Sequence, residues 1–97
     1  MDAATLRAAV VDVPARSRFE LALEGGTAFV DYRLAGDIAI VPHTEVPPAF
    51  EGQGVGRALV LGALDGFRAR GLKVQPRCSF FARVAMRDPA FADMLVR

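Results

Sequence analysis

A strand, a glycine-rich loop and a helix follow one another in residues 38–70, which read IAIVPHTEVPPAFEGQGVGRALVLGALDGFRAR. The apolar run at 38–41 is typical of a strand buried on both faces, and Pro47–Pro48 ends the strand because proline cannot donate to a β-ladder. Apolar side chains then recur at helical spacing, and Gly71 suits the left-handed position that closes a helix. The segment therefore predicts a strand over 37–46, a loop, and a helix that ends near Arg70.

The loop reads EGQGVG at residues 51–56 and places glycines at 52, 54 and 56. Glycine lets the backbone approach a ligand closely. The unpaired amides and the dipole at a helix N-terminus both favour an anion. This junction therefore predicts a phosphate or diphosphate site.

The spacing of these glycines and the residues after Gly56 exclude two families of phosphate-binding loops. A P-loop needs Lys-Ser or Lys-Thr after its second glycine, whereas Gly56 is followed by Arg57-Ala58. A dinucleotide fingerprint needs the spacing G-x-G-x-x-G near the start of a doubly wound fold. Here the spacing is G-x-G-x-G and too little chain follows.

The rest of the chain predicts a mixed α+β fold. Alternating apolar residues at 18–23 and 27–34, separated by Gly25–Gly26, indicate two strands that form an antiparallel meander with the strand over 37–46. A short strand at 72–77 follows the long helix, so a right-handed crossover makes it parallel to the strand over 37–46. Ser79 is the expected cap of a helix through about Met86, and Asp88–Pro89 begins a last helical turn.

Composition narrows the class of protein. The 97 residues fit a single domain, 1–97, and are 53% hydrophobic. Lys and Arg number 12 against 11 Asp and Glu, and this balance argues against a nucleic-acid partner. The one cysteine, Cys78, leaves no disulfide and no cysteine-based metal site, so no metal is expected. No membrane span and no signal peptide are recognised, and we expect a cytoplasmic protein.

The loop resembles the diphosphate motif of the GNAT superfamily of acetyl-CoA-dependent N-acetyltransferases, Q/R-x-x-G-x-G/A, at Gly54 and Gly56. Glu51 stands where that family usually has Arg or Gln. The wider segments HTEVP at 43–47 and PRCSF at 76–80 look like a group of small single-domain members. The resemblance runs from about Phe19 to Met94. It implies a GNAT-like fold without the N-terminal helices that cover the acceptor site in larger members.

The resemblance implies that acetyl-CoA or CoA binds along the groove from Val46 to Arg57. A backbone amide near Val46 would polarise the acetyl carbonyl. The residues expected to contact the cofactor are Thr44, Val46, Glu51, Gly52, Gln53, Gly54, Val55, Gly56 and Arg57.

Three side chains are candidates for proton transfer. His43 suits a general base near neutral pH, and Glu45, two residues further on, points to the same face and would share that role or orient the amine. Cys78 precedes a helix, which lowers the pKa of a thiol, and it would protonate the leaving thiolate or accept the acetyl group. Structural interpretations stay open: a packed strand-end histidine, an exposed strand carboxylate and a small buried hydrophobe.

Many GNATs use a tyrosine of the following helix as the general acid, and this chain has Phe80 and Phe81 there. The only tyrosine, Tyr32, is predicted to lie in the core, as are Met86, Phe91 and Met94. The sequence thus favours direct acetyl transfer to an unidentified amine, on a small molecule or a protein side chain. A non-catalytic CoA-binding or regulatory module is the alternative, and an interaction domain that keeps only the fold is the third hypothesis.

Overall fold

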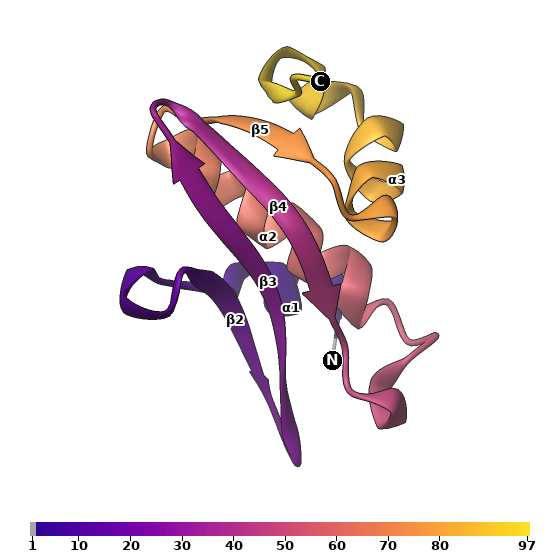
Figure 1. Ribbon diagram of the computed structural model, residues 1–97. Coiled ribbons are helices and arrows are strands. Elements are labelled where there is room, and N and C mark those ends of the chain that lie inside the picture. The colour runs from indigo at the N-terminus through magenta and orange to yellow at the C-terminus, as the bar shows by residue number, and fades with distance from the viewer. Residues whose placement is uncertain (1) are drawn as a thin grey trace.

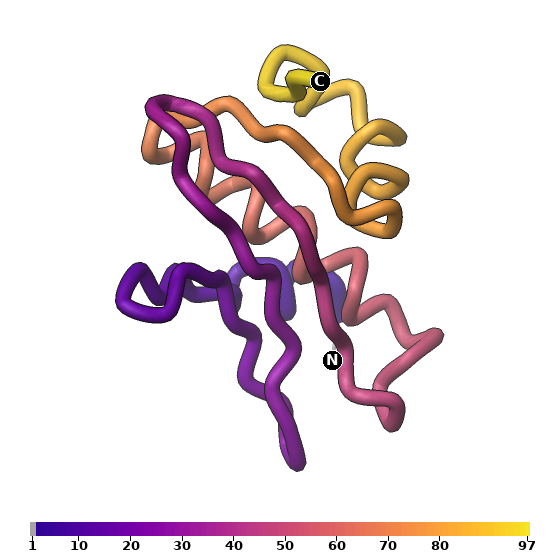
Figure 2. The backbone as a smooth tube through the Cα atoms, in the orientation of Figure 1, coloured from indigo at the N-terminus to yellow at the C-terminus, as the bar shows by residue number. Residues whose placement is uncertain are grey.

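A computed structural model describes residues 2–97 and shows a five-stranded sheet in the order β1-β2-β3-β4-β5 (Figures 1 and 2). The first four strands are antiparallel neighbours, and β5 runs parallel to β4. The strands are β1 (Val11–Val13), β2 (Arg18–Leu23), β3 (Gly26–Ala35), β4 (Ile38–Glu45) and β5 (Lys73–Pro76). The helices are α1 (Ala3–Ala8), α2 (Val55–Ala69) and α3 (Ser79–Arg87), with 3-10 turns η1 (Pro14–Arg16), η2 (Pro48–Phe50) and η3 (Pro89–Met94).

The predicted meander and crossover are confirmed by strands β2 to β5 and helix α2. The sequence did not indicate α1 and β1, because the six-residue helix buries only Leu6 and has no apolar stripe to read. Asp2 caps this helix by accepting a hydrogen bond from the Thr5 amide at 2.8 Å. One short helix therefore stands at the N-terminus, where the resemblance implied none of the usual helices. Of the helices in the described residues, none has both the length and the apolar character needed to cross a membrane.

Strand β4 is fully buried on only one face, so the expectation of burial on both faces is wrong. Ala39 and Val41 are completely buried, whereas Ile38 and Ile40 are half-buried. Figure 1 shows the reason, because α1 and α2 lie behind the sheet and leave its other face open.

Aromatic side chains join α2 to the sheet. The ring of Phe67 meets Phe19 edge-on at 4.8 Å between centroids and Tyr32 at 5.3 Å. The Tyr32 hydroxyl donates to Asp12 at 2.7 Å and accepts from Arg70 at 3.0 Å. Tyr32 is 5% exposed, which confirms that it is a core residue.

The C-terminal elements agree with the sequence in outline. Cys78, not Ser79, occupies the cap position of α3, and Ser79 is the first helical residue. The Asp88 carboxylate caps η3 by accepting from the Ala90 amide at 3.0 Å, as predicted. Phe91 and Met94 are buried, but Met86 is 73% exposed. The prediction of Met86 as a core residue is wrong because α3 buries only the face that carries Phe81 and Ala85.

The free edge of β5 is partly covered by the end of the chain. Leu95 forms a parallel bridge to Val74, and the Val96 amide donates to the Val74 carbonyl at 2.9 Å. The C-terminal residues thus extend the sheet by one short step beyond β5.

A register shift divides β4 into two parts. Arg33 pairs with Ile40 and Asp31 with His43, so two residues of β4, Val41 and Pro42, oppose one residue of β3. The ladder between β4 and β5 ends at the same place, with Val41 opposite Pro76. Beyond Val41 the two parallel strands therefore part, and the remainder of β4 pairs with β3 alone.

We expect Phe67→Ala to lower the free energy of unfolding by about 3–5 kcal/mol, because it removes a fully buried ring and leaves a cavity. Met86→Ala, at an exposed position, should change it by less than about 0.5 kcal/mol. Urea denaturation followed by circular dichroism measures both. Equal losses in the two variants would contradict the assignment of these side chains to the core and the surface.

Candidate functional site

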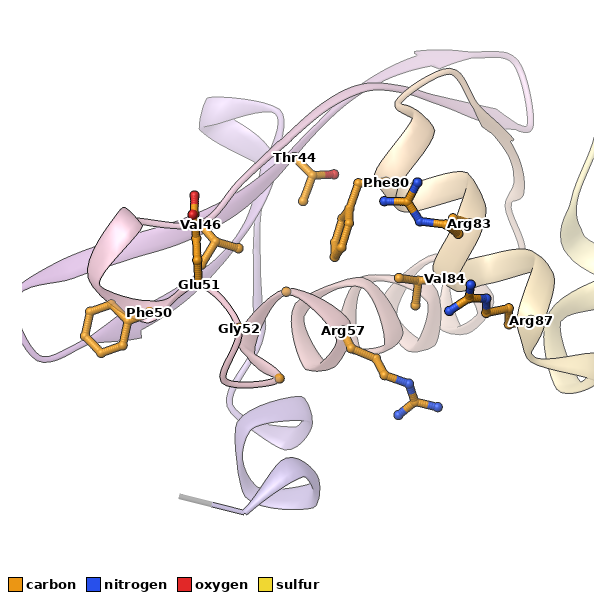
Figure 3. Close-up of a pocket in the computed structure, with 12 residues that line it drawn as sticks. Thr44, Val46, Phe50, Glu51, Gly52, Arg57, Phe80, Arg83, Val84 and Arg87 are labelled. Carbon is orange, nitrogen blue, oxygen red and sulfur yellow. The ribbon is translucent and has the colours of Figure 1, made fainter.

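A cavity of about 510 Å³ opens where β4 leaves β5 (Figure 3). Its walls come from the end of β4, the glycine loop, the start of α2 and one face of α3. The lining residues are Thr44, Val46, Phe50, Glu51, Gly52, Gly54, Gly56, Arg57, Phe80, Arg83, Val84 and Arg87. The unpaired edge of β4 therefore faces a space that a ligand can enter.

The loop glycines have two different structural roles. Gly52 and Gly54 have φ values of +76° and +80°, which residues other than glycine rarely adopt. A Cβ at either position would meet nothing within 4 Å, so the constraint is the backbone conformation and not the space. Gly56 has helical backbone, but a Cβ there would lie 2.8 Å from the Phe80 ring. The first two glycines shape the loop, and the third lets α3 approach α2.

The start of α2 presents unpaired backbone donors. The first hydrogen bond within the helix joins the Ala58 amide to the Gly54 carbonyl at 3.1 Å. The amides of Val55, Gly56 and Arg57 precede that bond, and Gly54 as the cap residue has no side chain to satisfy them. These amides and the helix dipole create a site for an anion.

The charged side chains around the cavity are mostly cationic. Arg57 extends from α2, Arg83 and Arg87 extend from α3, and Glu51 is on the loop (Figure 3). Within residues 2–97, none of these three arginines forms an ion pair. The cavity therefore combines helix-end amides with guanidinium groups, and both are suited to phosphate.

His43 and Glu45 lie on the open face of the sheet, away from α2. His43 Nε2 lies 3.3 Å from Glu45 Oε1, and the imidazole packs edge-on against Phe29 at 6.0 Å. Asp31 is the cross-strand partner of His43, which places both on the face opposite the core. The predicted shared orientation of His43 and Glu45 is confirmed, but neither side chain lines the cavity.

Cys78 is half-buried at the N-terminus of α3, and its sulfur faces Thr44. Burial raises the pKa of the thiol, but the Phe81 amide, the Thr44 hydroxyl and the Phe80 amide together hold it below its ordinary value. Thr44 Oγ1 is buried and has no hydrogen-bond partner of good geometry in the described part of the chain. The Cys78 sulfur is the nearby group to which this hydroxyl can donate.

His43 and Cys78 are separated by β4. Thr44 pairs with the buried Val30, so its side chain leaves β4 on the face opposite His43, and Cys78 approaches from the Thr44 side. Cooperation between His43 and Cys78 would therefore have to cross the opened edge of β4. Their roles in proton transfer stay predictions.

A family model described as GCN5-related N-acetyl-transferase matches residues 18–94. The chain belongs to the GCN5-related N-acetyltransferases. The solution structure of a GCN5-like candidate N-acetyltransferase from Staphylococcus aureus is similar in fold, with a TM-score of 0.69 and 22% sequence identity. The match covers 93% of this chain and 89% of that one. No match was found among curated proteins.

Most of the residues predicted to bind the cofactor in this acetyltransferase line one cavity. They are Thr44, Val46, Glu51, Gly52, Gly54, Gly56 and Arg57. The side chains of Gln53 and Val55 do not line it, because Gln53 donates to the Ala49 carbonyl at 3.0 Å and Val55 is 4% exposed in the core. Their backbone amides remain at the loop and the helix end.

Sequence reasoning missed the contribution of α3 and Phe50 to the cavity. Phe80 and Val84, and likewise Arg83 and Arg87, are four residues apart, so one face of α3 carries all four. The i, i+4 spacing of Arg83 and Arg87 could have indicated a cationic face on this helix. The sequence could not show that α3 packs close to the glycine loop, so it did not place that face in the cavity.

We expect the pKa of the Cys78 thiol to lie below the ordinary value for a cysteine, since helix-end amides and the Thr44 hydroxyl stabilise its thiolate. Thr44→Val should move the titration midpoint upward because it removes the Thr44 hydroxyl, which donates to the sulfur. The rate of alkylation by iodoacetamide as a function of pH measures the midpoint. Thr27→Val, at an exposed position of β3, is the matched control and should leave it unchanged. A midpoint above the ordinary value would contradict this description.

Proposed function

We propose that residues 1–97 act as one acetyl-CoA-dependent N-acetyltransferase domain that transfers an acetyl group directly to an amine. The observation that supports this most strongly is the meeting of three unpaired amides at the start of α2 with a free strand edge in one cavity. The unpaired amides suit a diphosphate. The free edge of β4 suits a ligand chain that carries amide groups.

The residues present fit coenzyme A. At Gly52 and Gly54 a Cβ would meet nothing within 4 Å, so the loop backbone is accessible to a ligand. The amides from Gln53 to Arg57 would hold the diphosphate, and β4 from Thr44 to Val46 would hold the pantetheine arm. When bound, acetyl-CoA supplies the acetyl group as a thioester.

The proposed chemistry uses groups of this chain on both sides of β4. His43 accepts the proton of the acceptor amine, and Glu45 orients the imidazole through the 3.3 Å contact. Cys78 would supply a proton to the departing thiolate, for which a thiol of lowered pKa is suited. An amide near Val46 would polarise the acetyl carbonyl. The acceptor is a small molecule or a protein side chain, and a reducing cytoplasm would keep Cys78 a free thiol.

A non-catalytic CoA-binding or regulatory module is the second candidate. It is favoured by Phe80, which lines the cavity on the helix where many family members carry a tyrosine as general acid. Binding of CoA without thiol release across a panel of amines would support this second function. Thiol release with any of those amines would support the transferase.

We expect acetyl-CoA to raise the unfolding temperature, because a ligand that binds only the folded state stabilises it. Gly54→Ala should lower the affinity for acetyl-CoA at least tenfold, and so reduce the rise in unfolding temperature, since the residue has φ +80° at the start of α2. The matched control is Gly71→Ala at the other end of α2, with φ +70° and equally open surroundings. Both variants carry similar backbone strain, so equal losses of binding would contradict the assignment.

Gly56 is a poorer choice for this test than Gly54. A side chain there would displace Phe80, so a bulky replacement would disturb the contact between α2 and α3 as well as the ligand.

Glu51→Arg is expected to change the affinity for CoA in the opposite direction from Gly54→Ala. It should tighten CoA binding at low ionic strength, and salt should reduce the gain.

We expect His43→Ala to lower turnover by about 10²–10⁴-fold, the usual contribution of a general base, and to leave the affinity for CoA unchanged. Cys78→Ser should give a loss in the same direction if the thiol donates the proton. Thiol release measures turnover, and mass spectrometry after incubation with acetyl-CoA shows whether Cys78 carries an acetyl group. Full activity of both variants would remove these residues from the mechanism.

A further inference from the structure

The two arginines of α3 are a second cationic feature of the cavity, separate from the end of α2. Arg83 and Arg87 are four residues apart on one helix, so they lie on the same face and repel each other. Arg87 is in the last turn, where the helix dipole favours a cation, but Arg83 is in the middle of α3 and gains little from the dipole. The dipole therefore does not account for this pair.

Within residues 2–97, five other arginines pair with carboxylates, whereas Arg33, Arg77 and Arg97 do not. Arg7 pairs with Asp65 at 2.6 Å, Arg70 with Asp12 at 2.6 Å, and Arg68 with Asp93 at 3.0 Å. No ion pair involves Arg57, Arg83 or Arg87 within residues 2–97, yet all three line one cavity. With Glu51 as the acidic residue of the lining, the cavity has an excess of two positive charges, whereas the whole chain has +1.

These three arginines lie on two different helices of the cavity. The amides at the start of α2 and the nearby Arg57 already suit a diphosphate, and Arg83 and Arg87 belong to a different helix across the cavity (Figure 3). A guanidinium group can donate two parallel hydrogen bonds to the oxygens of a phosphate. A phosphate monoester carries close to two negative charges at neutral pH. Coenzyme A carries one monoester, the 3′-phosphate of its ribose, in addition to its diphosphate.

We propose that Arg83 and Arg87 bind the phosphate monoester of the cofactor, so that the site selects coenzyme A over 3′-dephospho-coenzyme A. This inference rests on the proposed function, since it assigns a selectivity to the same cavity. It gives α3 a role in recognition that is independent of any proton transfer at Cys78.

Isothermal titration calorimetry with coenzyme A and its 3′-dephospho form tests the proposal without requiring turnover. The wild-type protein should bind coenzyme A about tenfold more tightly or better, as expected for charge-assisted hydrogen bonds. The double variant Arg83→Gln/Arg87→Gln should bring the ratio of the two affinities close to one, while the affinity for the dephospho form changes little. The preference of the wild type should also shrink as salt is added.

Arg33→Gln is the matched control, because Arg33 is exposed on β3, carries the same charge and does not line the cavity. It should leave the ratio of affinities at its wild-type value, and circular dichroism checks that every variant is folded. Equal affinities in the wild-type protein, or a preference that survives in the double variant, would overturn the inference and leave the proposed function standing. Failure of both ligands to bind the wild-type protein would overturn the proposed function and this inference together.

Discussion

The carbonyl oxygen of Val41 accepts hydrogen bonds from the amides of both Arg77 and Cys78, each at 2.9 Å. These bonds anchor the end of β5 and the beginning of α3 to the middle of β4, where the ladder between the two strands stops. Because α3 starts here, β5 cannot continue beside β4, and the second half of β4 keeps one free edge. The cavity, the position of Cys78 beside Thr44, and the arginine-bearing face of α3 all depend on this junction.

Helix α2 brings three elements close through glycines on its surface. Phe80 of α3 lies against Gly56, the Arg7 carbonyl of α1 lies 2.7 Å from where a Cβ of Gly62 would be, and the Phe19 ring of β2 occupies the position of a Cβ at Gly66. Glycine inside a helix lowers its stability relative to alanine. Here that cost is offset by closer packing against α3, α1 and the sheet.

The parts of the fold that are encoded locally could be predicted from the sequence. Turn residues at Gly36 and Gly71, the alternation of β2 and the capping carboxylate of Asp88 each act within a few residues, so the pattern reveals them. The exposure of Met86 could not be predicted, because it depends on which face of α3 meets α2. For the site, the glycine loop was visible, whereas the separation of His43 from Cys78 follows from a register shift in β4. Pro42 lies in that shift and is a local signal of a bulge or an edge, but it does not give the register that follows.

The bridge from Leu95 to Val74 has a consequence for the behaviour of the protein at high concentration. A sheet edge with free amides and carbonyls is a template on which a second molecule can add a strand. At one edge of this sheet, Leu95 and Val96 occupy part of β5, and Pro76 lacks an amide to donate. At the other edge, β1 is three residues long and is followed directly by Pro14. The outer strands β1 and β5 are thus poor templates for strand addition, and the second half of β4, beside the cavity, keeps the free edge that a further extended chain can approach.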